Sequence, residues 1–404
     1  MSLKIHRNIA LGAILGLQRI LDQHQPARIV VPQMFKMHRQ WGSRDRKTFG
    51  KILFDIMRWK ALFAHCAQTT KQNPNYYWEL VGVWCVLNKI ELPAWEELKT
   101  LSSTKILSHY NNPKLSNMLR QSFPQWLHEL GINSLGAQLW DQEMKALNQP
   151  TIRAIRVNRL KSTPKKLKQV LWDHHQVETF LMADYPDGLF FKNHEQLKRL
   201  PLFEKGLFEI QDGNSQRVAP FCHVLPGQKI LDACAGSGGK SLHLATLMEN
   251  SGIVLASDIR QNALDQVHIR AQRNGLENIQ TCLADSIPKS WINNTNVVLI
   301  DAPCSGTGVI QGSPETKWLL TQIKLENLLQ EQAKLLQNKA QYVKPNGTLI
   351  YATCSILAEE NQKQIEAFLT SSIGENFKLE KQDLHLTQET GFNGFFMARL
   401  RKKS

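Results

Sequence analysis

The sequence lacks several features that define common protein classes. None of its seven cysteines forms a C-x-x-C pair and its histidines show no ligand-like spacing, which argues against a zinc site and a disulfide framework. An odd number of thiols suits a reducing cytosol, so we expect a cytoplasmic protein. No apolar run is long enough to span a membrane, and no internal repeat or low-complexity tract occurs. We therefore expect a globular protein with neither a metal nor a membrane partner.

Acidic residues are scarce in the first half of the chain. Residues 1–205 contain 30 Lys and Arg against 16 Asp and Glu, whereas residues 206–404 contain 19 of each. The first half therefore carries the whole net charge of +14. Such asymmetry is typical of a nucleic-acid-binding half joined to a neutral half, although a basic surface without a partner remains an alternative.

Residues 1–140 are predicted to be a helical domain. Apolar residues recur at helical spacing, for example at Phe49, Ile52, Leu53, Ile56 and Phe63. Residues 36–47 mix cations with Trp41 and a Gly-Ser turn, which suits RNA contact or, equally, a solvated turn.

Residues 141–205 are predicted to form a small α+β module that binds RNA. Ile152 to Val157 alternate apolar and polar residues, as a half-buried strand does. Thr163 followed by Pro164 predicts the start of a helix, with Thr163 as N-cap. Seven Lys and Arg crowd residues 153–168; a charge run is usually a solvated face, but this one lies in the basic half.

Residues 206–404 alternate strands and helices, which predicts an α/β domain with a doubly wound parallel sheet. The expected strands are Lys229–Asp232, Ile253–Asp258, Ile279–Ala284, Val297–Asp301 and Thr348–Thr353. Helices are expected between them, including Lys240–Glu249, Gln261–Asn274, Leu319–Val343 and Ala358–Leu369.

A glycine loop, Asp232 to Lys240, joins the first of these strands to a helix. A phosphate-binding loop of the Walker type would need glycine at Cys234, and a dinucleotide fingerprint would need glycine or alanine at Ser241. Because both phosphate patterns fail, the loop favours a cofactor that has a ribose and a carboxylate but no phosphate, such as S-adenosylmethionine.

Two acids support this cofactor. Asp258 ends the second strand, 20 residues after Gly238, where an acid can bind ribose hydroxyls. Asp285 follows the third strand and can accept a hydrogen bond from an adenine amino group. Each alone is a common strand-end aspartate, but their occurrence after consecutive strands favours a cofactor site.

Two cysteines, Cys304 and Cys354, each follow a short apolar strand. Parallel strands end at one common edge, where α/β enzymes place their chemistry. Two thiols at that edge, with Asp301 beside one of them, indicate covalent catalysis assisted by a second cysteine. The alternative is that both are buried structural thiols, which is the interpretation we favour for Cys66, Cys85, Cys222 and Cys282.

Three segments resemble the signatures of the RsmB/Fmu/Sun family of RNA cytosine-C5 methyltransferases: Asp232–Lys240, Asp301–Gly308 and Tyr351–Ser355. Gly206–Ala219 and Gly394–Ala398 extend the match over about residues 150–404. The helical region with Trp41 to Arg46 more loosely resembles the NusB-like RNA-binding domain of the RsmB branch. The resemblance implies a class I, Rossmann-like methyltransferase sheet preceded by an all-α NusB-like bundle.

The same resemblance assigns roles to individual residues. It implies that Cys354 adds to cytosine C6 and that Cys304 assists product release. Asp301 is placed to meet N3. Lys240 either supports the loop or the active site or is a purely structural lysine at the start of the helix. A nucleophile is needed because cytosine C5 attacks a methyl sulfonium only after addition at C6 makes the ring an enamine. DNA cytosine-C5 methyltransferases use the Pro-Cys cysteine instead, which makes Cys304 the rival nucleophile. S-adenosylmethionine would be bound by Cys234, Ala235, Gly236, Ser237, Gly238, Gly239, Lys240, Asp258, Asp285 and Asp301.

Two positions depart from the family pattern. Ser237 stands where the family usually has proline, and Ala263 stands where it commonly has arginine, although Arg260 lies nearby.

We expect a monomer that forms 5-methylcytosine in ribosomal RNA, small-subunit rRNA in particular. The alternatives are a tRNA substrate, or an rRNA-binding assembly factor that has lost catalysis.

Overall fold

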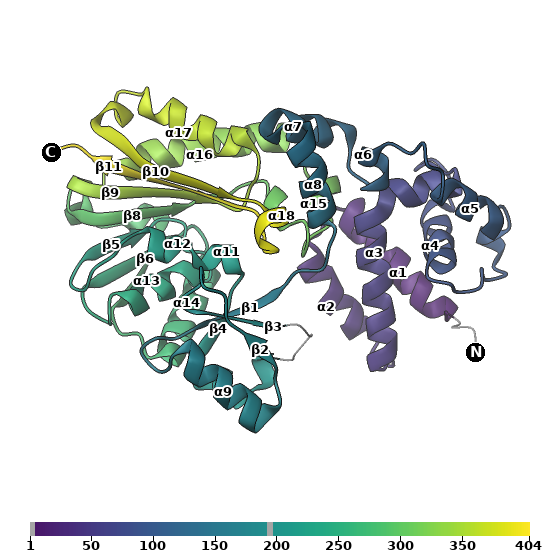
Figure 1. Cartoon of the computed structure of the whole chain (residues 1–404), viewed down its shortest axis with the longest axis horizontal. Coiled ribbons are helices and arrows are strands. Elements are labelled where there is room, and N and C mark those ends of the chain that lie inside the picture. The colour runs from purple at the N-terminus through teal and green to yellow at the C-terminus, as the bar shows by residue number, and fades with distance from the viewer. Residues whose placement is uncertain (1–4, 192–196) are drawn as a thin grey trace. The chain divides into compact units, whose positions relative to one another are not determined.

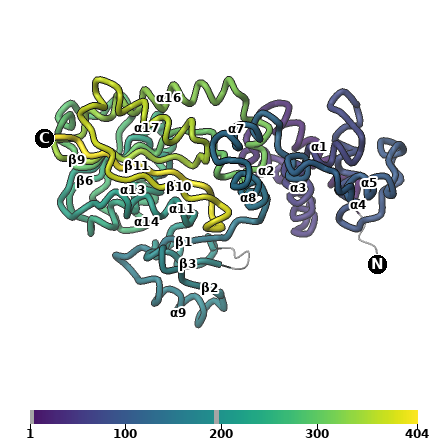
Figure 2. The backbone as a smooth tube through the Cα atoms, turned by 45° about the horizontal axis from the view of Figure 1, so that its top comes forward, coloured from purple at the N-terminus to yellow at the C-terminus, as the bar shows by residue number. Residues whose placement is uncertain are grey.

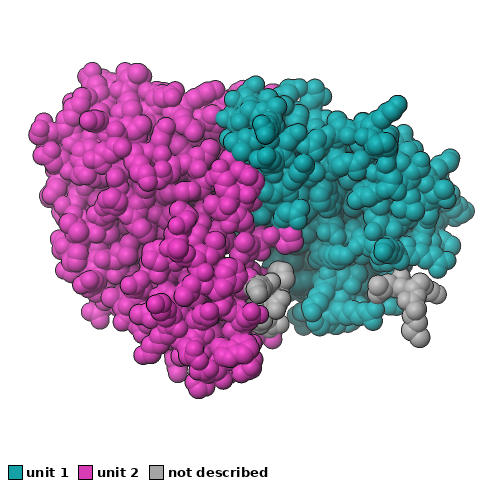
Figure 3. All heavy atoms as spheres, viewed as in Figure 1, with its two compact units in different colours: residues 1–149, 310–321 teal, residues 150–309, 322–404 magenta. Residues whose placement is uncertain are grey.

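The structure, a computed structural model, describes residues 5–191 and 197–404. The chain divides into two compact units (Figure 3). Unit 1 comprises residues 1–149 and 310–321, and unit 2 comprises residues 150–309 and 322–404. Each unit has its own hydrophobic core and is described separately.

Unit 1 is helical. Its elements are α1 (Arg7–Leu21), α2 (Ala27–Met37), α3 (Ser43–Ala67), α4 (Tyr76–Leu87), η1 (Glu96–Leu98), α5 (Ser103–Tyr110), α6 (Asn117–Arg120), α7 (Gln125–Leu135), α8 (Ala137–Leu147) and α15 (Thr316–Leu319). The five apolar residues that predicted a helix within residues 49–63 are all buried on α3, in the core against α1 and α4. Helical periodicity therefore predicted this core face correctly.

Trp41 belongs to the core of unit 1. Its side chain is buried, and its ring stacks on His38 with centroids 4.2 Å apart. The indole also packs against Gly12, where an added Cβ would lie 2.4 Å from the ring. Trp41 is therefore not available to stack on a base, whereas Arg39 and Arg44 of the same stretch are exposed.

The segment Ile310–Thr321 belongs to unit 1 although the chain on both sides belongs to unit 2. Lys317, on α15, is completely buried. Its ammonium group donates to four oxygens: Arg58 O at 2.9 Å, Gln121 O at 3.2 Å, Ser122 O at 3.2 Å and Asn148 Oδ1 at 2.8 Å. This buried cation, together with hydrogen bonds made by Gln311 and Trp318, holds the returning segment within the helical unit.

Unit 2 begins with a four-stranded sheet in the order β2-β3-β1-β4. Its strands are β1 (Arg153–Val157), β2 (Thr179–Phe180), β3 (Gly188–Phe191) and β4 (Phe208–Ile210). Helix α9 (Pro164–His175) packs Leu167 and Leu171 against this sheet. As predicted, Thr163 caps α9: its hydroxyl accepts from the Lys166 N–H, and Pro164 occupies the first helical turn.

Short helices link the small sheet to the large one and connect the later strands. They are η2 (Leu197–Arg199), α10 (Pro201–Glu204), α11 (Gly213–Gln216), α12 (Val218–Phe221), η3 (Ala284–Ser286), η4 (Lys289–Trp291), η5 (Thr307–Val309), η6 (Ala358–Glu360), η7 (Gly374–Asn376) and α18 (Thr387–Thr390).

The large sheet of unit 2 has seven strands in the order β10-β11-β9-β8-β5-β6-β7. They are β5 (Lys229–Asp232), β6 (Ile253–Asp258), β7 (Ile279–Leu283), β8 (Thr295–Asp301), β9 (Val343–Thr353), β10 (Phe377–His385) and β11 (Phe395–Lys402). The first five are parallel, while β11 is antiparallel to β9 and β10 to β11.

Helices cover both faces of this sheet (Figures 1 and 2). Helices α12 and α13 (Gly239–Leu247) share a core with one face, and α14 (Gln261–Asn274) adds Ala271 to it. Helices α16 (Gln322–Ala340) and α17 (Gln362–Leu369) share a core with the other face. The predicted α/β fold with a Rossmann-like sheet and an N-terminal helical region is confirmed.

Two details of the predicted elements are wrong. The helix expected over Leu319–Val343 is instead α16, which starts at Gln322, because residues up to Thr321 pack in unit 1. The helix expected from Ala358 begins as the 3-10 turn η6, and α17 starts only at Gln362. The antiparallel strands β10 and β11 were not predicted as strands.

Candidate functional site

The carboxyl ends of the five parallel strands gather the predicted site residues at one edge of the large sheet. Asp232 ends β5, Asp258 ends β6, Asp301 ends β8, and Cys354 directly follows β9. Asp285 lies in the 3-10 turn η3 that follows β7. Parallel pairing, not sequence proximity, therefore brings these groups together.

The glycine loop between β5 and α13 is fixed by hydrogen bonds to neighbouring strands. The Gly236 N–H donates to Asp258 Oδ2 at 2.8 Å, and the Ala235 N–H donates to Ser257 O at 2.9 Å. Gly238 has φ of 85°, and an added Cβ would lie 2.9 Å from Leu242, so glycine is required at this position. Asp232 accepts from Ser241 Oγ at 2.6 Å beneath the loop.

Asp258 is mostly buried and ionised. Burial opposes its charge, but hydrogen bonds from Arg260 and from the Gly236 N–H outweigh burial and lower the pKa of Asp258. Arg260 contacts Oδ1 through both its backbone N–H, at 3.0 Å, and its Nε, at 3.1 Å. Ala263 stands where the family commonly has arginine. In this chain Arg260, three residues earlier, supplies a cation beside Asp258.

Apolar surface lies exposed next to both candidate cofactor acids. Ile259, adjacent to Asp258, is 78% exposed, and Leu283, at the end of β7, is 40% exposed. Asp285 is exposed too. An adenine packed on Ile259 and Leu283 would remove this surface from water while the two carboxylates accept from hydroxyl and amino groups. These residues fit the adenosine part of S-adenosylmethionine.

The two cysteines predicted for catalysis are in contact. Cys304 Sγ and Cys354 Sγ lie 3.3 Å apart. The hydrogen bond to Cys354 and the burial of the side chain raise the pKa of Cys304 well above its ordinary value. The neutral thiol form of Cys304 is therefore favoured, and either sulfur could donate in the contact between the two.

Asp301 forms an ion pair with Lys240. Lys240 Nζ lies 2.6 Å from Asp301 Oδ2, and its ammonium also sits 5.0 Å from the centre of the Phe395 ring. Burial would lower the pKa of Lys240, but the neighbouring Asp301 outweighs burial and raises it. The Asp301 carboxylate consequently has a charged proton donor within hydrogen-bonding distance.

A buried carboxylate, Glu360, holds the loop that carries Cys304. It accepts from the backbone N–H of Ser305 at 2.7 Å, from the Ser305 hydroxyl, and from Gln332 Nε2 at 3.0 Å. Its charge also contributes to the raised pKa of Cys304. Glu360 ends the 3-10 turn η6, which precedes α17 and follows the Cys354 segment.

Gly308 and Gly394 let the Cys304 loop approach the ends of β9 and β11. An added Cβ on Gly308 would lie 2.3 Å from Gly394 O and 2.8 Å from Cys354 O. Instead, the Gly308 N–H donates to Cys354 O at 3.0 Å, and the Gly394 N–H donates to Gly308 O at 2.8 Å. These contacts fix the backbone that carries both thiols.

Sequence reasoning missed two arginines that contact the glycine loop, Arg156 on the small sheet and Arg270 on α14. Arg156 is buried, and its guanidinium donates to Gly239 O at 2.6 Å and to Gln211 Oε1. Arg270 donates to Ser237 O and to Glu209. Arg156 therefore lies neither on a solvated face nor on a surface open to RNA, the two interpretations given for the charge run. The alternating pattern predicted only a half-buried strand, and nothing in the sequence marked Arg156 as one of its buried residues.

Among residues 5–191 and 197–404, no group of three or more His, Cys, Asp or Glu side chains is arranged to hold a metal ion. In the same residues, no helix is long and apolar enough to cross a membrane.

Cys234 lies in the glycine loop. Burial and the neighbouring Asp232 raise the pKa of Cys234, which favours its neutral thiol form.

A seven-stranded sheet, a glycine loop after β5 that matches neither phosphate-binding pattern, and acids at the end of β6 and after β7 define a class I, S-adenosylmethionine-dependent methyltransferase. Residues 222–401 match the family described as 16S rRNA methyltransferase RsmB/F. The chain is 33% identical to ribosomal RNA small subunit methyltransferase B of Klebsiella pneumoniae strain 342, over 98% of both chains. It is 28% identical to the protein of that name from Escherichia coli O6:K15:H31, over 99% of this chain and 100% of the relative.

Solved structures agree with these sequence relatives. The structure titled PH0851 superposes with a TM-score of 0.80 and 25% identity over 100% of both chains. NSun6 from Pyrococcus horikoshii, solved with SFG, has a TM-score of 0.61 and 21% identity over 70% of this chain and 99% of its own, which shows the fold alone. The chain belongs to the RsmB/Fmu/Sun family of S-adenosylmethionine-dependent rRNA methyltransferases.

Proposed function

We propose that the protein forms 5-methylcytosine in small-subunit ribosomal RNA through a covalent adduct between Cys354 and cytosine C6. The observation that carries this proposal is the Cys304–Cys354 contact of 3.3 Å, in which Cys354 and burial raise the pKa of Cys304. A raised pKa disfavours Cys304 as the attacking thiolate, which supports Cys354 as the nucleophile. S-adenosylmethionine supplies the methyl group when it is bound.

The addition step uses the ion pair beside the thiols. Cys354 Sγ bonds to C6, and the electrons of the C5–C6 double bond shift so that negative charge develops toward N3. Asp301 delivers a proton to N3 and receives one from Lys240, 2.6 Å away. The resulting enamine has C5 as its nucleophilic carbon, which takes the methyl group.

The release step uses Cys304. Once Cys354 is bonded to carbon, it no longer accepts a hydrogen bond from Cys304 or repels its negative charge, so the main cause of the raised Cys304 pKa disappears. Cys304 then gives its proton to water and accepts the C5 proton. The C5–H electrons restore the double bond and expel Cys354 as thiolate, while N3 returns its proton to Asp301. The net products are methylated cytosine, the demethylated cofactor and one proton.

The basic first half would bind the RNA backbone. Most of the excess charge in residues 1–205 comes from surface Lys and Arg, including exposed Arg39 and Arg44 of unit 1 and Arg153 of unit 2. We expect RNA affinity to fall steeply with salt because cations displace the counterions of phosphates. Binding that is insensitive to salt would contradict this role.

The deciding experiment incubates the protein with deproteinised ribosomal RNA and labelled S-adenosylmethionine, followed by nucleoside analysis. We expect label in 5-methylcytosine of small-subunit rRNA, and little in tRNA tested in parallel. In Cys304→Ala, release fails and a covalent RNA–protein adduct accumulates. The double variant Cys304→Ala, Cys354→Ala should form no adduct; an adduct in the double variant would refute Cys354 as nucleophile. Absence of any labelled nucleoside would instead favour a non-catalytic assembly factor.

A further inference from the structure

Helix α9 carries an exposed tryptophan on its outer face. Trp172 is 51% exposed, whereas the chain's other tryptophans, all within the described residues, are buried or partly buried. The helix does not need this ring for its core, because Leu167 and Leu171 pack it against the small sheet. In Figures 1 and 2 the small sheet lies between α9 and the large sheet. A single exposed apolar residue is common on protein surfaces, so the significance of Trp172 depends on its neighbours.

Lysines flank Trp172 on the same side of α9. Lys168 lies one turn and Lys165 two turns before Trp172, about 6 and 10 Å along the helix axis, so the three side chains share one face. Lys166 lies farther round the helix, and all three lysines are exposed. Among residues 5–191 and 197–404, none of the three pairs with a carboxylate. Asp173, the one acid of α9, accepts instead from a neighbouring glutamine at 2.8 Å.

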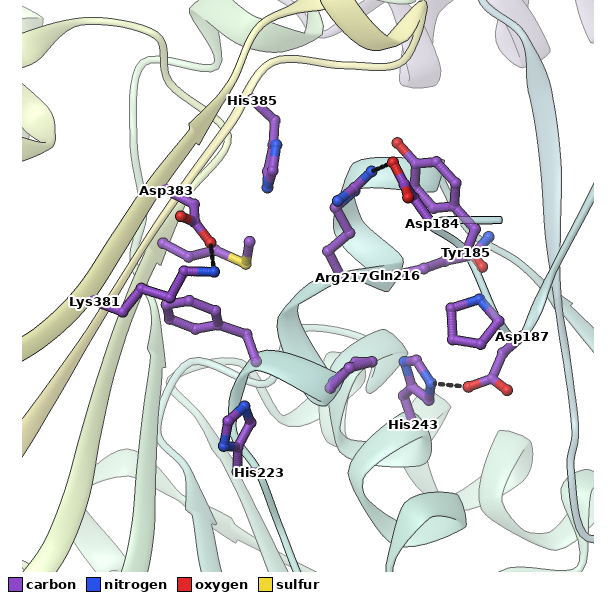
Figure 4. A pocket seen from close by; sticks show the side chains of 14 residues that line it. Asp184, Tyr185, Asp187, Gln216, Arg217, His223, His243, Lys381, Asp383 and His385 are labelled. Carbon is purple, nitrogen blue, oxygen red and sulfur yellow. Dashed lines mark hydrogen bonds and ion pairs between the residues drawn. The ribbon is translucent and has the colours of Figure 1, made fainter. Parts of the chain in front are cut away.

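The cations beside a cavity of unit 2 are paired, in contrast to the lysines of α9. This cavity has a volume of about 260 Å³ and lies beside β10. Figure 4 shows Lys381 next to Asp383, at 2.8 Å, and Arg217 next to Asp184, at 3.3 Å. Because each of these cations already has a carboxylate, the cavity attracts a polyanion less than the outer face of α9 does.

We propose that the outer face of α9 binds a single-stranded segment of the RNA substrate, with one unpaired base stacked on Trp172 and phosphates held by Lys165 and Lys168. The proposal rests on the proposed RNA methylation. Unpaired RNA bases stack on aromatic side chains, and lysine binds phosphate as a point charge. A nucleotide places its base and adjoining phosphates within reach of side chains one and two helical turns apart. An acidic protein segment would use the lysines but not the flat indole, so single-stranded RNA fits this face better.

Contacts within unit 2 fix this face relative to the catalytic edge. Arg156, on β1, donates to Gly239 O at 2.6 Å, at the start of α13. Asn158, between β1 and α9, donates to Asn274 O at 2.9 Å, at the end of α14. Both donors are buried. A base held on α9 would therefore lie at a fixed distance from the strand ends where the cytosine is methylated.

The test measures binding of a labelled oligoadenylate of about ten nucleotides to the full-length protein by fluorescence anisotropy, without cofactor. Trp172→Ala should weaken binding about tenfold because the stacked base loses its aromatic surface, whereas Trp172→Phe should bind within about threefold of the unchanged protein. Ile323→Ala, at a 70% exposed position of α16, is the control for loss of exposed apolar surface. Equal binding by Trp172→Ala and this control would overturn the proposal.

An abasic oligonucleotide separates stacking from charge. It keeps the sugar-phosphate backbone but has no base to stack. The preference of the unchanged protein for oligoadenylate over the abasic strand should fall about tenfold in Trp172→Ala. A merely structural role of Trp172 would weaken both strands equally, and this result would refute stacking. Thermal unfolding of each variant separates loss of binding from loss of fold.

Salt dependence tests the lysines. Lys168→Gln should weaken oligoadenylate binding and reduce the slope of log affinity against log salt concentration by about 1, because one phosphate contact is lost. Lys334→Gln, at an exposed position of α16, is the matched control and should leave the slope unchanged. Equal slopes for the two variants would show that Lys168 holds no phosphate. A polyglutamate peptide that competes as well as oligoadenylate would indicate an acidic protein partner; either result would overturn the proposal.

Failure of this proposal is distinguishable from failure of the proposed function. If 5-methylcytosine forms in rRNA but Trp172→Ala binds RNA as the unchanged protein does, only the role of α9 is wrong. If Trp172 and Lys168 contribute to binding as expected but rRNA receives no methyl group, the catalytic proposal fails and the RNA-binding face stands. In an active enzyme, Trp172→Ala should raise KM for rRNA about tenfold and leave kcat within about twofold, because Trp172 is not one of the reacting groups.

Discussion

The two units differ in how they use buried charge. In the described part of unit 1, the buried charged side chains are Glu79, Glu143 and Lys317, and the core is otherwise built from helix faces and aromatic rings. In unit 2, buried charge gathers around the glycine loop and the strand ends, at Arg156, Glu209, Asp232, Asp258 and Glu360. Buried charge is expensive unless it is paired. In unit 1 the buried Lys317 connects segments that are far apart in the chain. In unit 2 the buried charged groups fix the edge of the large sheet that carries Cys304 and Cys354.

The largest expected difference is between the effects on methylation of removing one thiol from each unit, Cys354 from unit 2 and Cys85 from unit 1. Cys354→Ala should reduce methylation at least about a thousandfold, because the nucleophile is lost while the fold remains. Cys85→Ala, at a buried thiol in the core of unit 1 whose pKa burial raises to about 12, should leave methylation within about twofold. Single-turnover assays with labelled cofactor measure both variants. Substantial activity in Cys354→Ala would show that Cys354 is not the nucleophile.

The next contrast concerns Lys317. Lys317→Met leaves four buried oxygens without their shared donor and should lower the free energy of unfolding by about 3 kcal/mol. Lys145→Met, at an exposed position of α8, should change it by less than about 0.5 kcal/mol. Denaturant unfolding measures the difference. Equal stability of the two variants would show that this buried cation does not hold Ile310–Thr321 in place.

Arg156 tests whether the small sheet supports the cofactor loop. Arg156→Met removes the donor to Gly239 O and should weaken binding of S-adenosylhomocysteine about tenfold. Arg153→Met, an exposed position on the same strand, is the matched control and should bind as the unchanged protein does. Calorimetric titration gives both affinities. If the two variants bind equally well, the loop does not depend on Arg156.

The smallest expected effect is a pH dependence at Asp232. Burial raises the pKa of Asp232 to about 6, above that of an unfolded aspartate. The folded state therefore binds more protons than the unfolded state between pH of about 4 and 6, and this group's contribution to stability falls as pH rises through that window. Asp232→Asn should raise the free energy of unfolding on the order of 1 kcal/mol at pH 7 and change it little at pH 4. A loss of stability at pH 7 would show that the ionised carboxylate is favoured in the fold.

The sequence predicted β5, β6 and β8 closely because each is a short apolar run that ends in an aspartate. By contrast, β9 begins at Val343 and not at the expected Thr348, and β7 ends at Leu283 and not at the expected Ala284. Lys229–Asp232 and Ile253–Asp258 agree with β5 and β6 to the residue. Strands β10 and β11 were missed because they extend the parallel sheet by antiparallel pairing, β11 with β9 and β10 with β11, and because β10 is largely exposed. Its charged sequence, Lys378 to Asp383, gives no apolar signal.

What the sequence determined by itself was the inventory of chemistry: two thiols, three strand-end acids, a glycine loop unsuited to phosphate, and an excess of cations in residues 1–205. What only the tertiary structure decided was which of these groups touch. The 3.3 Å between Cys304 and Cys354, the Lys240–Asp301 ion pair and the burial of Arg156 join residues 50, 61 and 83 positions apart. Proton positions depend on such contacts, because burial and a neighbouring donor shift a pKa far more than local sequence does. The contact between the two thiols is therefore a property of the fold.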